Sequence, residues 1–181
     1  MVTFINLLTF SRIVLAAIIF LLIMFADYFS ALIIFCLAGL TDWLDGYLAR
    51  KYNAVSQLGE ILDPIADKIL IVFVFFALAV DISSYLIGFC SAFIITREIW
   101  VGALRDLNAR NNISDATKVT FLAKIKTTIQ LFTISLYLLA LALNNPLMIV
   151  IGDIFLLISL LVTIYTGFIY TLKSMEANRL K

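Results

Sequence analysis

The sequence predicts an all-α integral membrane protein with six transmembrane helices and both termini in the cytoplasm. Hydrophobic residues make up 64% of the 181-residue chain. Charged residues make up 14%, against about 25% in ordinary soluble domains. Apolar runs long enough to cross a bilayer recur along the chain, with short polar connections between them. At this length we expect a single transmembrane domain over residues 1–181.

The apolar runs predict helices over about 4–26, 29–50, 58–80, 83–105, 118–143 and 147–172. The connections near 27–29, 81–83 and 144–146 contain no lysine or arginine. Basic residues lie at the opposite face: Arg50, Lys51, Arg105, Arg110, Lys118, Lys173, Arg179 and Lys181. The positive-inside rule places that face in the cytoplasm. We therefore expect a multi-pass protein of the inner (cytoplasmic) membrane.

Polar residues interrupt the first apolar run near its cytoplasmic end. Asn6, Thr9 and Arg12 follow one another at a spacing of three, which places them on one helix face. One interpretation is an interfacial entry segment with a snorkelling arginine. The other is a contact to a lipid headgroup or a nucleotide. The residues alone leave both open.

Four aspartates occupy the second and third runs. Asp42 and Asp45 are three residues apart, and Asp63 and Asp67 are four apart, so each pair shares one helix face. Helix rise places Asp42 about 22 Å and Asp63 about 27 Å from the outer boundary, in a hydrocarbon slab about 30 Å thick. The four carboxylates are therefore expected to converge at the cytoplasmic edge of the membrane, where the active site would lie.

Carboxylates so close to lipid need cations, because an ionised acid at mid-bilayer costs on the order of 3 kcal/mol. Pairing with Arg50, Lys51 and Lys68 at a helix end is one solution. The other is bound metal. The chain has no histidine, so any metal or acid–base chemistry rests on carboxylates. Oxygen-only ligands suit Mg²⁺ or Mn²⁺, and two such ions can clamp a diphosphate.

A basic cluster is expected on the same side as the acids. Arg97 lies inside the fourth run, Arg105 lies two turns further on nearly the same face, and Lys124 and Lys126 open the fifth run. These residues could form an ordinary positive-inside collar. Their position within helices favours a cavity that takes a second phosphorylated substrate. Asp153, near the outer end of the sixth run, is interpreted as an interhelical hydrogen-bonding residue or an interfacial carboxylate, without a catalytic role.

The aspartates belong to a longer pattern, D-x-x-D-G-x-x-A-R-x₈-G-x-x-x-D-x-x-x-D, which is met by Asp42, Asp45, Gly46, Ala49, Arg50, Gly59, Asp63 and Asp67. With this pattern the chain resembles the CDP-alcohol phosphotransferase family. The segments NLLTFSRI, TREIWVGALR and KIKTTIQ make it similar to the phosphatidylglycerophosphate synthase branch. The resemblance implies transfer of a phosphatidyl group from CDP-diacylglycerol to sn-glycerol 3-phosphate, which yields phosphatidylglycerophosphate and CMP.

The resemblance also implies roles for single residues. Asp42, Asp45 and Asp63 would hold one metal ion, Asp42, Asp63 and Asp67 a second, and Asp67 would be the general base. The CDP-diacylglycerol site would comprise Asn6, Thr9, Arg12, Gly46, Ala49, Arg50, Ser56 and Gly59. The glycerol phosphate pocket would comprise Arg97, Arg105, Lys124 and Lys126. Two positions depart from the family pattern: Ile5 replaces its proline and Ala123 replaces its glycine.

Other functions compete with this interpretation. A cardiolipin synthase or a phosphatidylserine synthase would use the same metal site, but neither acceptor has a free phosphate monoester that explains the extra cations. A cation transporter would need acids across the whole membrane, whereas these gather at one edge. Membrane lipid and a second copy of the chain, as a homodimer, are the partners that the resemblance implies. We expect no nucleic-acid partner.

Overall fold

The computed structural model describes residues 2–52, 57–111, 113 and 121–179, with side chains described except at 2–6, 43, 45–50, 52, 57, 58, 60, 61 and 124. These residues form helices without any strand. The helices are α1 (Val2–Met24), α2 (Tyr28–Tyr52), α3 (Gln57–Asp81), α4 (Tyr85–Arg110), α5 (Phe121–Ala142) and α6 (Pro146–Arg179). The predicted all-α class is confirmed, and each helix overlaps one predicted range.

Two helices extend well past their predicted C-terminal ends. The structure extends α4 to Arg110 and α6 to Arg179, past the expected ends at 105 and 172. The predicted ends of these two helices lie where their apolar runs stop. However, helix continuation depends on backbone propensity, and neither 106–110 nor 173–179 contains a glycine or proline that would stop a helix. Both extensions carry the helices beyond their apolar runs.

Four of the described helices contain segments that are long and apolar enough to cross a membrane, namely Leu7–Met24, Tyr85–Arg110, Phe121–Ala142 and Pro146–Arg179. The apolar stretch of α2 is shorter, Tyr28–Asp42. Asp63, Asp67 and Lys68 place charge within α3. The apolar helices indicate a membrane protein. The acid-bearing helices α2 and α3 are those that depart from a simple span.

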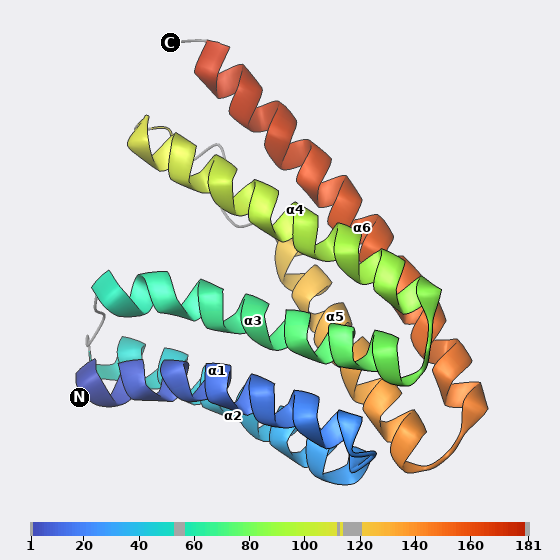
Figure 1. Cartoon of the computed structure of the whole chain (residues 1–181). Helices are drawn as coiled ribbons and strands as arrows, with labels where there is room; N and C mark the ends of the chain where they lie inside the picture. Colours follow the sequence, from blue (N-terminus) through green and yellow to red (C-terminus); the bar gives the residue numbers. More distant parts are fainter. Residues whose placement is uncertain (1, 53–56, 112, 114–120, 180–181) are drawn as a thin grey trace.

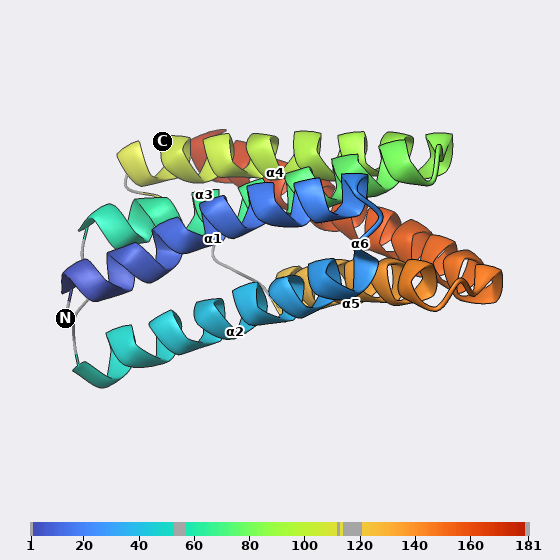
Figure 2. The same ribbon diagram turned by 60° about the horizontal axis from the view of Figure 1, so that its bottom comes forward.

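The helices pack as a closed ring (Figures 1 and 2). α1 packs on α2 and α3, α3 packs on α4, α4 packs on α6, α6 packs on α5, and α5 returns to α2. A further contact joins α3 to α5 across the ring. The start of α1, the end of α2, the start of α3 and the end of α6 lie toward one end of the bundle, and the turns of α1–α2, α3–α4 and α5–α6 lie at the opposite end (Figure 1).

Three tight turns close the helix pairs α1–α2, α3–α4 and α5–α6. Each turn has a residue in the left-handed conformation: Ala26 (φ 57°), Ser83 (φ 52°) and Asn144 (φ 50°). The next N–H donates to a carbonyl five residues back: Asp27 to Leu22 (2.9 Å), Ser84 to Ala79 (3.0 Å) and Asn145 to Ala140 (2.9 Å). This is the Schellman motif. The three pairs are therefore helical hairpins with the same turn.

Apolar and polar side chains divide the bundle along its length. The main hydrophobic cluster lies toward the tight turns and includes Ile23, Phe35, Leu78, Ile87 and Leu138. Buried polar residues lie mostly toward the other end: Thr9, Arg12, Arg97, Asn108, Lys126, Gln130, Thr163, Thr166 and Ser174. Buried polar groups need partners to offset their desolvation. The polar end is therefore where a site is expected.

Candidate functional site

The polar end of the bundle centres on Arg12 of α1. Its Nη1 donates to Asp42 Oδ1 of α2 at 2.5 Å and also to Asp67 Oδ1 of α3, and its Nη2 lies 3.3 Å from Asp63 Oδ1. Thr9, one turn earlier in α1, donates its hydroxyl to the same Asp63 Oδ1 at 2.7 Å. The predicted convergence of the α2 and α3 acids is thus observed for three of the four aspartates.

The guanidinium and the carboxylates differ sharply in exposure. The Arg12 side chain is 0% exposed, whereas those of Asp42, Asp63 and Asp67 are 52%, 46% and 43% exposed. The arginine therefore lies behind the acids, within the helix packing. The acids keep an open side from which a ligand can approach.

The donor set fits a hard divalent cation. Asp42, Asp63 and Asp67 offer only oxygen, they converge on one positive charge, and they remain half open. Within the described side chains, no three metal-binding residues are already arranged around a single point. The fourth predicted ligand, Asp45, lies outside the described side chains. The described aspartates are therefore arranged around the guanidinium.

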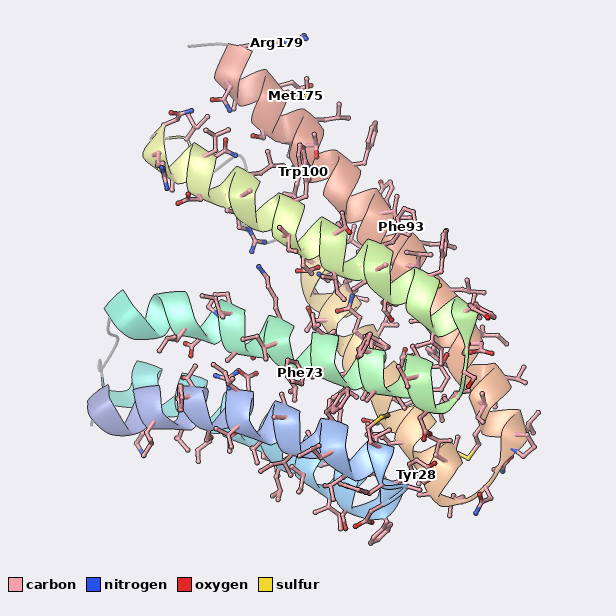
Figure 3. All side chains as sticks on the ribbon, in the orientation of Figure 1. Tyr28, Phe73, Phe93, Trp100, Met175 and Arg179 are labelled. Atoms are coloured by element: carbon pink, nitrogen blue, oxygen red, sulfur yellow. The ribbon has the colours of Figure 1, made fainter. Side chains whose placement is uncertain are left out.

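A cavity of about 380 Å³ opens beside these acids, between α3, α4 and α5. Asp67 and Lys68 contribute to its α3 wall, and Glu98, Arg105 and Lys126 contribute charged groups from α4 and α5. The remaining lining is largely apolar: Ile65, Ile69, Ile71, Val72, Phe73, Ile94, Ile95 and Ile99. Nitrogen-tipped side chains of α3 and α4 point into the space between these helices (Figure 3). One cavity therefore joins an acid of the cluster to three cationic side chains.

Glu98 organises the cationic wall. Lys126 of α5 donates to Glu98 Oε1, and Arg97 Nη1 donates to the same oxygen at 3.0 Å. Lys126 is 4% exposed and Arg97 is 9% exposed, so the pairing offsets the desolvation of both cations. Lys68 Nζ lies 3.5 Å from the Glu98 carbonyl oxygen. One glutamate thus binds a cation from α4 and a cation from α5, of which Lys126 lines the cavity.

Arg97 itself is directed away from the cavity. Its Nε donates to Thr163 O at 3.1 Å, and its Nη2 donates to Thr166 Oγ1 at 2.8 Å. Both partners belong to α6. Arg97 lines a shallow depression beside Trp100 (labelled in Figure 3) and Gly167, on the α4–α6 surface. The structure therefore places Arg97 as a link between α4 and α6 and not among the residues that line the cavity.

Tyr170 of α6 lies between two arginines. The guanidinium carbons of Arg97 and Arg105 each lie 5.6 Å from the centre of its ring. Cation–π attraction is effective within about 6 Å. Arg97 is already hydrogen-bonded to α6, while Arg105 is exposed and lines the cavity. The ring therefore supports Arg105 at the edge of the cavity.

The structure brings together Thr9, Arg12, Asp42, Asp63 and Asp67, and it places Arg105 and Lys126 on the adjoining cavity. Gly59 is buried in α3. The remaining predicted residues lie outside the described side chains: Asn6, Asp45, Gly46, Ala49, Arg50, Ser56 and Lys124.

Sequence reasoning missed two residues that line the cavity and one that contacts Arg105 beside it. Glu98, Gln130 and Tyr170 were not predicted as site residues. Gln130, which lines the cavity, donates to Thr163 Oγ1 at 3.4 Å. Glu98 and Gln130 are polar residues within apolar helices. Their positions could have indicated site residues from the sequence alone. Nothing in the sequence distinguishes Tyr170 from other aromatic residues of α6.

The fold and site define the chain as a helical membrane protein with clustered aspartates. The sequence profile of the CDP-alcohol phosphatidyltransferase family matches residues 2–165, and the chain belongs to this family. Similar curated proteins include the CDP-diacylglycerol–glycerol-3-phosphate 3-phosphatidyltransferases of Escherichia coli (strain K12), Escherichia coli O157:H7 and Shigella flexneri serotype 5b (strain 8401). Each is 36% identical over 107 residues, which is 59% of this chain and 59% of the relative.

Proposed function

We propose that the protein transfers the phosphatidyl group of CDP-diacylglycerol to sn-glycerol 3-phosphate and releases CMP. Family membership supports the donor, and the relatives' names support the acceptor, although the match spans 59% of their length. The observation that carries the acceptor assignment is the cavity that Asp67 shares with Arg105 and Lys126. A phosphate monoester needs cations, and the hydroxyl of the same small molecule needs a base.

The proposed reaction assigns a task to each group. Asp42, Asp45, Asp63 and Asp67 would hold two Mg²⁺ or Mn²⁺ ions, which supply charge neutralisation at the diphosphate. Asp67 accepts the proton of the glycerol hydroxyl. The hydroxyl oxygen then forms a bond to the phosphorus that carries diacylglycerol, while the bond from this phosphorus to the bridging oxygen breaks and CMP leaves.

The cationic wall orients the acceptor. Lys126 and Arg105 bind its phosphate, which directs its hydroxyl toward Asp67 across the cavity. Glu98 holds Lys126 in the absence of substrate and limits the repulsion between the cations. The CDP end of the donor is assigned to Thr9, Arg12, Gly59 and the predicted residues of the α2–α3 segment: Asn6, Gly46, Ala49, Arg50 and Ser56.

The proposed topology has six spans with both termini in the cytoplasm of an inner-membrane protein. The tight turns contain no lysine or arginine, whereas Arg105 and Arg110 lie near the opposite end of the bundle. This asymmetry supports a cytoplasmic site. Accessibility labelling of single cysteines placed at Asn145 and at Arg110 tests the orientation, because only Asn145 should be labelled from outside. A homodimer remains part of the proposal on resemblance alone.

The reaction is tested by CMP release from purified protein supplied with CDP-diacylglycerol, Mg²⁺ and one acceptor at a time. We expect release only with sn-glycerol 3-phosphate, and a loss of turnover of about a hundredfold or more in Asp67→Asn. CMP release with phosphatidylglycerol or serine would show that the acceptor assignment is wrong, while the proposed metal site would stand. Near-normal turnover of Asp67→Asn would refute the base assignment. Uptake of Mn²⁺ into vesicles without any CDP-lipid would favour the transporter alternative.

A further inference from the structure

The position of Arg12 behind the acid cluster has no role in the proposed reaction beyond the contact with the donor. Its guanidinium contacts carboxylates from two helices while it belongs to a third. Helix ends that need a counter-ion usually recruit an exposed lysine or arginine, which can snorkel to water. Arg12 is instead fully buried. Burial of an arginine is costly unless it is paired, so its contacts with the acids are required for this packing.

The contacts of Arg12 use the oxygens that a metal ion would need. Arg12 Nη1 donates to both Asp42 Oδ1 and Asp67 Oδ1. Asp63 Oδ1 accepts hydrogen bonds from Arg12 Nη2 and from the Thr9 hydroxyl. A guanidinium and a divalent cation also repel each other at close range. A metal ion that bound these same Oδ1 atoms would therefore compete with the guanidinium for them.

We propose that Arg12 is a built-in counter-cation that competes with divalent metal for the carboxylates of Asp42, Asp63 and Asp67. The proposal rests on the metal site of the proposed function. Without metal, Arg12 holds α1 against α2 and α3 and limits repulsion among the acids. Metal binding displaces the guanidinium from these oxygens. By linkage, each cation lowers the affinity of the cluster for the other.

Competition and structural support predict opposite changes in metal affinity when Arg12 is replaced. If Arg12 merely supported the metal site, its loss would weaken metal binding, as loss of an outer-shell partner normally does. If Arg12 competes, its neutral replacement leaves the carboxylates available and tightens metal binding. The sign of the change therefore separates the two roles without any reference to catalysis.

The experiment is Mn²⁺ titration of the purified full chain without CDP-lipid, by calorimetry or by the electron paramagnetic resonance of free Mn²⁺. We expect Arg12→Gln to bind Mn²⁺ about tenfold more tightly than wild type, and Arg12→Lys to stay close to wild type. Arg110→Gln is the matched control. It removes the same charge from an exposed pair with Asp106 (2.8 Å), and its Mn²⁺ affinity should be unchanged.

Thermal unfolding adds a second readout. Arg12→Gln should unfold at a lower temperature than wild type in EDTA, and Mn²⁺ should raise its unfolding temperature by more than it raises that of wild type. If Arg12→Gln binds Mn²⁺ as tightly as wild type or more weakly, the competition is overturned, but the proposed metal site stands. Absence of Mn²⁺ binding by wild type and Arg12→Gln alike overturns both the competition and the metal part of the proposed function.

Wild-type protein provides a test that needs no variant. Arg12 should resist phenylglyoxal in EDTA, because its side chain is buried, and become reactive when Mn²⁺ is added. The modified peptide is quantified by mass spectrometry, with the exposed Arg110 as the internal reference. An Arg12 reactivity that Mn²⁺ leaves unchanged or lowers overturns the proposed displacement, even if Arg12→Gln does not fold.

Discussion

Substitution of Gly167 by alanine tests whether the packing of α4 on α6 controls the cavity that we propose for the acceptor. A β-carbon at position 167 would lie 2.8 Å from Arg97 Cγ and 3.2 Å from Arg97 Nε. Arg97 cannot simply swing away, because hydrogen bonds hold it to Thr163, Thr166 and Glu98. An inserted methylene in a packed site costs about 1–3 kcal/mol, and one lost charged hydrogen bond costs about 1.5–3 kcal/mol more.

We expect Gly167→Ala to lose at least about 2 kcal/mol of unfolding free energy and to raise KM for glycerol 3-phosphate severalfold. The reason for the KM effect is that a displaced Arg97 moves Glu98, which holds Lys126. Stability is measured by denaturant unfolding in detergent, and KM by CMP release.

Gly152→Ala is the matched control. Its β-carbon would meet the Tyr137 ring at the same 2.8 Å, and Tyr137 donates to Asp153 at 2.6 Å in the apolar half of the bundle. We expect similar destabilisation with an unchanged KM. If neither variant altered KM, the link from Arg97 to the cavity would be refuted. Wild-type stability in Gly167→Ala would refute the packing argument itself.

Three further predictions concern the cavity and the turns. Lys126→Met should raise KM for glycerol 3-phosphate at least about tenfold, since one charged hydrogen bond is worth about 1.5–3 kcal/mol; a larger effect on kcat would contradict a binding role. Tyr170→Leu should raise this KM about threefold by removing the ring beneath Arg105, and Tyr170→Phe should retain the wild-type value; equal KM values for both variants would exclude cation–π support. Ala26→Gly should raise the unfolding free energy by about 1 kcal/mol, because glycine adopts the left-handed conformation without a side-chain clash; a lower value in denaturant unfolding would count against strain at this turn.

The part of the site that depends on helix periodicity could be predicted from the sequence. The spacing of Asp63 and Asp67 fixed which face of α3 is acidic, and Thr9 and Arg12 shared one face of α1 for the same reason. All four meet in the structure. Each of these predictions needed only local geometry and the reasonable assumption that charged faces in an apolar bundle face one another.

Contacts between distant helices could not be predicted in this way. Arg97 was expected in the acceptor pocket from its position on α4, but its partners Thr163 and Thr166 are on α6. The close approach depends on the absence of a side chain at Gly167. A glycine within an apolar run does not reveal which helix it will face, because that depends on the packing of the whole ring.

The three identical turns have a consequence for how the chain enters a membrane. Each turn joins two helices over a few residues, and none contains a lysine or arginine that would have to cross the lipid. In the proposed six-span topology, the chain would be inserted as three paired hairpins, one after another during synthesis. Of the three aspartates, only Asp42 would be available to Arg12 when the first hairpin has entered, because Asp63 and Asp67 arrive only with the second. Assembly of the acid cluster would then mark the joining of the first two hairpins.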